Sequence, residues 1–168
     1  MSIIPLVHRA KRLADFLERT DLWFVLGGQS PWRDETLPPP PDPDWLTVPE
    51  AWGFKQADTV VPVFPDVDGP LFTPDGIYRP VEARDVESLL LAKALQAFVS
   101  VRIRPGDFPT GLTCRIVGLT TGLRRHNSNR RALLAEDVIH PGLLLWVSTY
   151  RPFRVGESLV DLHVILHF

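Results

Sequence analysis

The sequence predicts a mainly β protein, an antiparallel β-sandwich with one N-terminal α-helix and long proline-rich loops. Several segments have the short apolar runs or the alternation of β-strands, and residues 160–168 alternate most regularly. Residues 6–19 form the one clear amphipathic helical pattern. The chain also contains 17 prolines among 168 residues, about twice the usual proportion. Because proline fixes φ and removes a hydrogen-bond donor, this content favours short elements joined by long ordered loops.

The first two elements follow each other directly. Residues 6–19 place apolar side chains at helical spacing, so one face of this helix should pack on a sheet or on a partner. Residues 22–27 are an unbroken aliphatic and aromatic run that ends at glycine, which predicts a buried strand. Residues 28–58, here called the arm, look mostly irregular and extended, with one helical turn expected at 49–52.

The middle of the chain mixes strands with turns. Residues 59–64 predict a short strand, and Pro62 within it suggests a sheet edge or a bulge. Residues 65–80 are rich in Pro, Asp and Gly, which is typical of turns. Residues 86–95 can form a helix, whereas residues 95–103 change to the two-residue period of a strand.

The last third of the chain predicts three strands. They cover residues 113–120, 143–150 and 160–168, with a polar loop at 124–131. In the final strand one face should be buried and the other partly wet. The buried side chains are expected to be Val160, Leu162, Val164, Leu166 and Phe168.

Length and composition favour a single domain over residues 1–168. A net charge of −2 gives no general attraction to nucleic acid or to anionic lipid. The single Cys114 excludes an intrachain disulfide and a CxxC metal site. No apolar run reaches the length of about 20 residues that a bilayer span needs, and residues 3–7 are too short for a signal peptide. We therefore expect neither a nucleic-acid partner nor a membrane partner.

No catalytic, cofactor-binding or metal-binding residues are predicted. The glycine pair at 27–28 is not followed by a phosphate-binding motif. His163 and His167 stand four residues apart on one strand, about 13 Å, which is too far for one metal ion. Cys114 falls within a strand, where a thiol is usually inert. The alternative is a small metal- or ligand-binding β-domain enzyme that uses Asp161, His163 and loop carboxylates.

The arm is the strongest candidate for a protein interface. Four tryptophans lie within 30 residues, and Pro38–Pro41 can form a stiff polyproline II segment that is ordered before it binds. The same rings could instead cover the protein's own core. A third hypothesis is a proline-dependent adaptor, in which residues 38–43 bind an SH3 or WW domain.

One basic cluster brackets the polar loop at 124–131. It lacks the interleaved aromatic residues of single-strand nucleic-acid binders, so it is either a solvated loop or a protein contact. With the arm, it completes the set of candidate interface residues: Trp32, Pro38, Pro39, Pro40, Pro41, Trp45, Trp52, Arg124, Arg125, Arg130 and Arg131.

Several segments together resemble the baseplate wedge protein of T-even-like contractile-tailed bacteriophages. They are LWFVLGGQSPW at 22–32 with the PPPPDP that follows, CRIVGL at 114–119, YRPF at 150–153 and LHVILHF at 162–168. Their order matches, and the similarity covers residues 1–65 and 94–168. The T-even protein is about twice as long, and its large middle insertion is absent here, so contacts made by that insertion do not carry over.

The resemblance implies a structural, non-enzymatic subunit of the virion. It would lie in the tail baseplate, assembled in the host cytoplasm, and would contact other wedge and hub proteins. The resemblance is also compatible with a homodimer of this chain. The expected mode of action is protein–protein contact during tail assembly, without cofactors.

Overall fold

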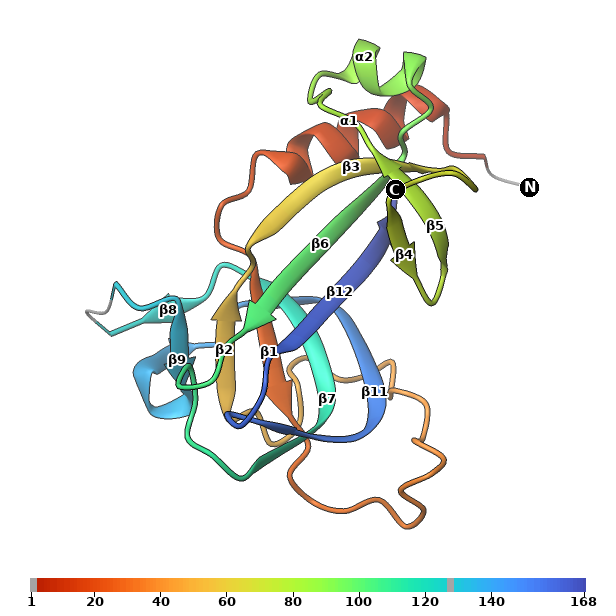
Figure 1. Ribbon diagram of the computed structural model, residues 1–168. Helices are drawn as coiled ribbons and strands as arrows, with labels where there is room; N and C mark the ends of the chain where they lie inside the picture. The colour runs from red at the N-terminus through yellow and green to blue at the C-terminus, as the bar shows by residue number, and fades with distance from the viewer. Residues whose placement is uncertain (1–2, 127–128) are drawn as a thin grey trace. The chain divides into compact units, whose positions relative to one another are not determined.

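Strands dominate the structure, a computed structural model that describes residues 3–126 and 129–168 (Figure 1). The sheets are antiparallel and a helix precedes them, which confirms the predicted mainly β class. The chain forms two compact units. Unit 1 comprises residues up to Thr20 with 58–100 and 162–168, and unit 2 comprises residues 21–57 and 101–161.

Unit 1 is built on a five-stranded sheet with the strand order β12-β6-β3-β5-β4. Two of these strands, β6 and β12, continue into unit 2. The helices α1 and α2 pack together, and α1 also contacts β3 (Figure 1). The elements are α1 (Leu6–Leu17), β3 (Thr59–Pro65), β4 (Leu71–Thr73), β5 (Gly76–Pro80), α2 (Val86–Leu91), β6 (Gln96–Ile103) and β12 (Val160–His167).

The helices of unit 1 follow from local sequence. In α1 the buried side chains recur at helical spacing, from Ala10 through Leu13 to Leu17. The ring of Phe16 lies 5.1 Å from that of Phe168, which holds the end of β12 against the helix. The shorter α2 begins at Asp85, whose carboxylate accepts a hydrogen bond from the Ser88 amide at 2.9 Å and so caps the helix.

The sequence expectations for unit 1 hold in part. Pro62 does lie at a local edge, because residues 59–62 of β3 pair only with β6, and pairing with β5 begins at Val63. The turn-rich stretch 65–80 also forms a hairpin, β4–β5, closed across Thr73 and Gly76. Finally, of the side chains expected to be buried in the last strand only Val164 is, whereas Val160, Leu162, Leu166 and Phe168 are half-buried. On the opposite face, which is otherwise partly exposed, Ile165 is buried because it packs against Val63 and Tyr78.

Unit 2 is built on a second five-stranded sheet with the order β11-β7-β1-β2-β9. Both faces of β7 are buried along most of its length. A separate pair, β10-β8, and the 3-10 helix η1 complete the unit. The elements are β1 (Trp23–Gly27), β2 (Gly53–Gln56), β7 (Leu112–Thr121), β8 (Arg124–Arg125), β9 (Ala132–Leu134), η1 (Ala135–Asp137), β10 (Val138–His140) and β11 (Leu143–Val155).

In unit 2 the arm and the basic loop are more ordered than the sequence indicated. Residues 53–56 of the arm form β2, which pairs with β1 in the centre of the sheet, and no helical turn forms at 49–52. The amide of Trp52 donates to the Leu26 carbonyl at 2.9 Å, so the backbone at this point is hydrogen-bonded to β1. Part of the expected loop at 124–131 is strand β8, while residues 127–128 of that loop lie outside the described residues.

We propose that the two units unfold as the single domain expected from the sequence. The chain passes between the units four times, at two connections and inside two strands, so neither unit consists of one continuous segment. A chain threaded in this way favours cooperative unfolding. We expect one calorimetric transition whose calorimetric and van't Hoff enthalpies agree; two resolved transitions would contradict the proposal.

Candidate functional site

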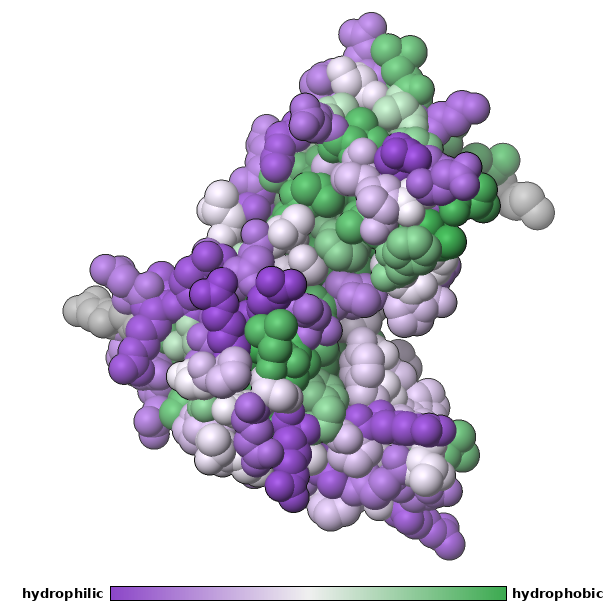
Figure 2. All heavy atoms as spheres, in the orientation of Figure 1, coloured by the Kyte–Doolittle hydropathy of each residue, from purple (hydrophilic) through white to green (hydrophobic). Residues whose placement is uncertain are grey.

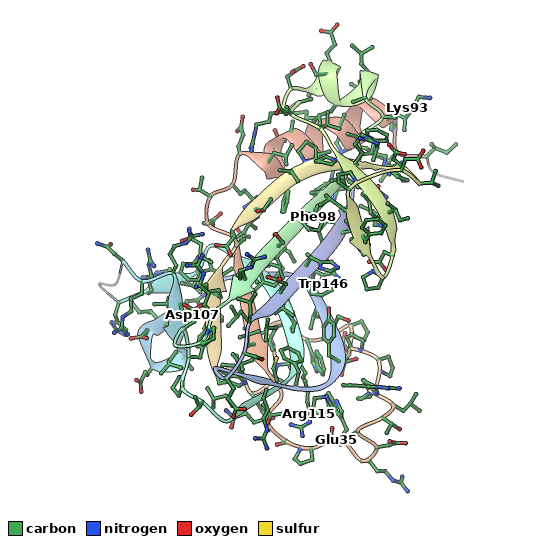
Figure 3. All side chains as sticks on the ribbon, viewed as in Figure 1. Glu35, Lys93, Phe98, Asp107, Arg115 and Trp146 are labelled. Carbon is green, nitrogen blue, oxygen red and sulfur yellow. The ribbon has the colours of Figure 1, made fainter. Side chains whose placement is uncertain are left out.

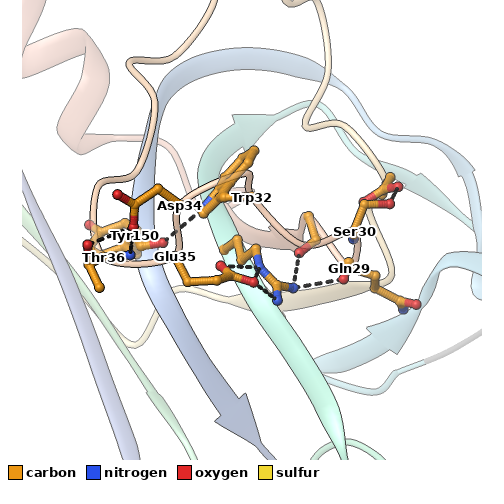
Figure 4. A network of polar contacts seen from close by, with 10 residues as sticks. Gln29, Ser30, Trp32, Asp34, Glu35, Thr36 and Tyr150 are labelled. Carbon is orange, nitrogen blue, oxygen red and sulfur yellow. Dashed lines mark hydrogen bonds and ion pairs between the residues drawn. The ribbon is translucent and has the colours of Figure 1, made fainter.

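Arg115, in the middle of β7, binds the first part of the arm. Its side chain is 8% exposed. Its Nη1 donates to the carbonyl oxygens of Gln29 at 2.7 Å and Gly28 at 3.3 Å. Its Nε and Nη2 donate to the carboxylate of Glu35, at 3.0 and 2.5 Å for the shortest contacts (Figure 4). Arg115 and Glu35 lie side by side in Figure 3. One buried guanidinium therefore fixes residues 28–35 through a two-point carboxylate contact and two backbone carbonyls.

The contact shifts the titration of both partners. Hydrogen bonds from Arg115, aided by its charge, hold the pKa of Glu35 below its ordinary value. The same carboxylate raises the pKa of Arg115. At the mouth of the arm, Glu50 accepts hydrogen bonds from the amide and hydroxyl of Ser30, which lower its pKa as well. The carboxylates of Glu35 and Glu50 are therefore ionised at neutral pH, where they accept the hydrogen bonds that hold the arm.

We expect acid to weaken this attachment. Because the pKa of Glu35 is lowered in the folded protein, its stabilising effect is fully present above the unfolded pKa of about 4.3. The effect is lost as the pH falls from there through the lowered folded value. Urea midpoints measured against pH should show wild type above a Glu35→Gln variant near neutral pH, with the difference closing below about pH 4. A constant difference across that range would contradict the assignment.

A second line of contacts joins the arm to β11. The Thr149 hydroxyl donates to the Pro39 carbonyl at 2.5 Å, and Arg151 Nε donates to the Thr36 carbonyl at 3.1 Å. The indole Nε1 of Trp32 donates to the Tyr150 carbonyl at 3.5 Å, a long hydrogen bond (Figure 4). These contacts run along the strand whose other side pairs with β7, so the arm lies against its own sheet.

The tryptophans of the arm face inward to different degrees. Trp52 is buried; its Nε1 donates to the Thr113 carbonyl at 3.3 Å, and its ring meets Phe108 edge-on at 5.5 Å. Trp32 and Trp45 are half-buried against the core cluster of unit 2. Their rings therefore contribute to the protein's own core, which was the alternative to an interface role.

The prolines present two faces. Pro38 and Pro41 are half-buried, whereas Pro39 and Pro40 are exposed. This spacing matches the three residues per turn of a polyproline II segment that lies on a surface. On either side of the prolines, two leucines of the arm point into solvent: Leu37 is 74% exposed and Leu46 is 85% exposed. The outward side of the arm therefore presents leucine and proline side chains, interspersed with the exposed charged residues Arg33, Asp34, Asp42 and Asp44, on a backbone that is held in position.

The basic cluster is distributed between strand and loop. Arg125 lies over the ring of Trp23, 5.2 Å from its centroid, and donates to the Arg130 carbonyl at 2.7 Å. Arg131 donates to the Ala57 carbonyl at 3.1 Å. Arg124 and Arg130 are exposed. Two of the four arginines thus support the local fold.

The histidines and the cysteine weighed for chemistry are engaged in structural contacts or buried. His163 stacks on Phe98 at 5.8 Å, and His167 Nδ1 lies 2.9 Å from the Gln96 side-chain nitrogen. Burial raises the pKa of the Cys114 thiol to about 12, so it is protonated at neutral pH. Among residues 3–126 and 129–168, no three His, Cys, Asp or Glu side chains are grouped as metal ligands. The same residues contain no helix with the length and apolarity of a membrane span.

Sequence reasoning missed the residues that fix the arm. In the sequence, Arg115 is only one residue of the expected strand at 113–120, and Glu35 is only one residue of the irregular arm. The available signal was a charged residue inside an otherwise apolar strand, since a buried arginine requires a partner. Lys55 is likewise a charged residue within a buried strand, β2, and it is paired with Asp107 at 2.9 Å.

Comparison with known proteins gives a consistent result. The family model described as "Baseplate wedge 3 tail fiber network component" matches residues 1–166. Among curated proteins, the chain is similar to "Virion protein 3" of Enterococcus phage phiEF24C. The two are 29% identical over 131 residues, which cover 76% of this chain and 72% of that protein.

Proposed function

Because this chain belongs to the family of baseplate wedge 3 tail fiber network components, we propose that it acts as a wedge subunit that binds its neighbours through the arm. Family membership makes the chain a structural protein of the phage virion, located in the tail baseplate. It also confirms the resemblance to baseplate wedge proteins seen in the sequence. Such a component interacts with other baseplate proteins; the wedge position and the surface used are our proposal.

One observation carries the proposal. The backbone of the arm is fixed to β7 and β11 by Arg115, Thr149 and Arg151, yet its apolar outer side chains face solvent. A loop that is rigid before binding loses little conformational entropy when a partner covers it. Proline and leucine on a fixed surface then offer apolar area for association.

In the proposed mode of action the protein forms contacts with its neighbours and catalyses no reaction. The buried, protonated thiol and the dispersed histidines support a role in which the protein contributes surface and rigidity. The arginines at 124 and 130 are proposed as a second, polar contact at the side of unit 2. We propose wedge and hub proteins of the same baseplate as partners.

The experiment is complementation of a phage that lacks the gene. A Leu37→Asp/Pro40→Asp variant places charges on the outer face of the arm without touching Arg115 or Glu35. We expect the purified variant to keep its thermal midpoint while infectious tails fall by at least about tenfold, as charges in an interface centre disfavour binding. Val67→Asp/Leu91→Asp, with equally exposed apolar side chains in unit 1, is the matched control. Normal tails from the arm variant would overturn the proposal.

Truncation of Trp32 would be a less informative test. Trp32 packs on the core of unit 2 and hydrogen-bonds Tyr150, so its loss would change stability and interface together. The outer-face variant separates the two effects.

A further inference from the structure

We propose that an extended segment of a neighbouring baseplate protein adds to the sheet of unit 2 as a further strand beside β9. The inference rests on the proposed contact with neighbours at the side of unit 2, and it names the surface and the kind of segment that binds there. It does not involve the arm. The strand β9 is the last in the order β11-β7-β1-β2-β9, and residues 3–126 and 129–168 place no strand on its outer side (Figure 1).

The pairing of β9 with β2 decides which of its backbone groups face outward. The Gln56 amide donates to the Arg131 carbonyl at 2.8 Å, and the Ala135 amide donates to the Trp52 carbonyl at 3.1 Å. Hydrogen-bonded and non-hydrogen-bonded pairs alternate along an antiparallel ladder. Since Leu133 lies halfway between Arg131 and Ala135, its amide and carbonyl are the groups of β9 that face β2.

The backbone groups of Ala132 and Leu134 therefore face the outer side. The Leu134 amide donates to the Asp137 carboxylate at 3.1 Å, so this donor is satisfied within the unit. The Ala132 amide and the carbonyls of Ala132 and Leu134 remain at the edge. A row of such groups is a template for another strand, and main-chain hydrogen bonds supply the affinity when one is added.

A groove lies beside these groups. It has a volume of about 330 Å³ and is lined by all of β9 and by the loop at 106–109. The loop is held in place, because Asp107 pairs with Lys55 at 2.9 Å and the ring of Phe108 meets Trp52 edge-on at 5.5 Å. A cavity of about 150 Å³ accepts a benzene-sized group, so the groove has room for a short extended segment. Its fixed walls also limit the conformational entropy lost on binding.

The lining specifies the chemistry of the segment. The buried side chains of Phe108 and Leu133 favour apolar residues at its centre. Exposed Arg130 lines the groove near the start of β9, and Asp137 lies at the other end, where it accepts from Leu134. Figure 2 shows hydrophilic side chains gathered on the side of unit 2 that holds β8 and β9. Charge complementarity favours a segment with an acidic residue beside Arg130 and a basic residue beside Asp137.

Hydrogen exchange resolved to single amides tests the backbone pairing in the purified chain and in purified tails. In the free chain the Ala132 amide should exchange fast and the Leu133 amide slowly, because only Leu133 is paired with β2. In tails the Ala132 amide should exchange at least about tenfold more slowly than in the free chain. Equal exchange of this amide in the two samples would overturn the proposal.

Proline at position 132 distinguishes strand addition from simple coverage. It removes the outward amide, and proline is tolerated at a sheet edge where the amide has no partner in the ladder. We expect Ala132→Pro to keep the thermal midpoint of the purified chain and to give at least about tenfold fewer infectious tails on complementation. Ala132→Ser is similar in size and keeps the amide, so it is the matched control and should assemble as wild type does.

The outcomes for the edge of β9 and for the arm can be told apart. Normal tails from a folded Ala132→Pro variant, or equal losses from Ala132→Ser, would overturn the inference. If the proline variant does not fold, the exchange of the wild-type Ala132 amide in tails decides. If Leu37→Asp/Pro40→Asp tails are normal while Ala132→Pro tails fail, the role of the arm falls and this inference stands; the converse result has the opposite meaning.

Discussion

Replacing Gly27 by alanine should destabilise the protein by about 2–3 kcal/mol, the range of an overpacked core. A Cβ at this position would lie 2.5 Å from the Pro49 carbonyl oxygen and 2.6 Å from Cγ1 of Val48. The residues it meets belong to the returning part of the arm, so the arm would have to move away from the end of β1. The amide of Gly28, which donates to the same carbonyl at 3.1 Å, would be displaced as well. Urea denaturation followed by tryptophan fluorescence measures the change.

Gly111 provides the comparison for this substitution. A Cβ there meets nothing within 4 Å, but the residue has φ of +85°. Alanine at 111 should therefore cost only about 1 kcal/mol, the effect of the left-handed backbone alone. Equal losses at the two positions would mean that the close approach of the arm to β1 is not a source of stability.

Replacing Arg115 by methionine should release the first part of the arm. The carbonyls of Gly28 and Gln29 would lose a charged donor, and we expect a loss of about 2 kcal/mol from those hydrogen bonds. Methionine keeps most of the apolar stem, so the change isolates the guanidinium. Hydrogen exchange should rise in residues 28–37 and remain unchanged in β1 and β7.

Two variants refine this result. Arg115→Lys keeps the charge but cannot reach Glu35 and both carbonyls with one planar group, so its loss should be intermediate. Arg154→Met on β11 removes a guanidinium that is mostly exposed and 3.8 Å from Glu157, and should be close to neutral. If exchange in residues 28–37 is the same in wild type and Arg115→Met, the arm is held by something other than Arg115.

Local patterns accounted for the regular elements. The helix at α1, the strands β1 and β7 and the alternation in β6 and β12 follow from periods of 3.6 and 2 in the sequence. Long-range partners explain what the patterns missed. The strand β2 is short and polar at one end, and it is defined by its pairing with β1 and β9 rather than by its own composition. Ile165 is buried because Val63 and Tyr78, about 100 residues away in sequence, cover it.

In the candidate site, too, local sequence indicated some features, and long-range contacts decided the others. Proline and tryptophan content marked the arm as a segment made for stiff contacts, and the resemblance pointed to the family that the comparison confirms. The attachment of the arm was not visible, because Glu35 and Arg115 are 80 residues apart. Which face of the arm stays outward depends on that attachment. Leu37, Pro39, Pro40 and Leu46 could therefore be separated from the inward Trp45 and Trp52 only once the fold was known.

Photocross-linking in assembled tails tests the central claim most directly. A photoreactive amino acid at position 40, on the outer face of the arm, should give a product whose mass is that of this chain plus another baseplate protein. The same group at position 91, an exposed site in unit 1, should give little of that product. Tails in which position 40 cross-links only within its own chain, or not at all, would contradict the account.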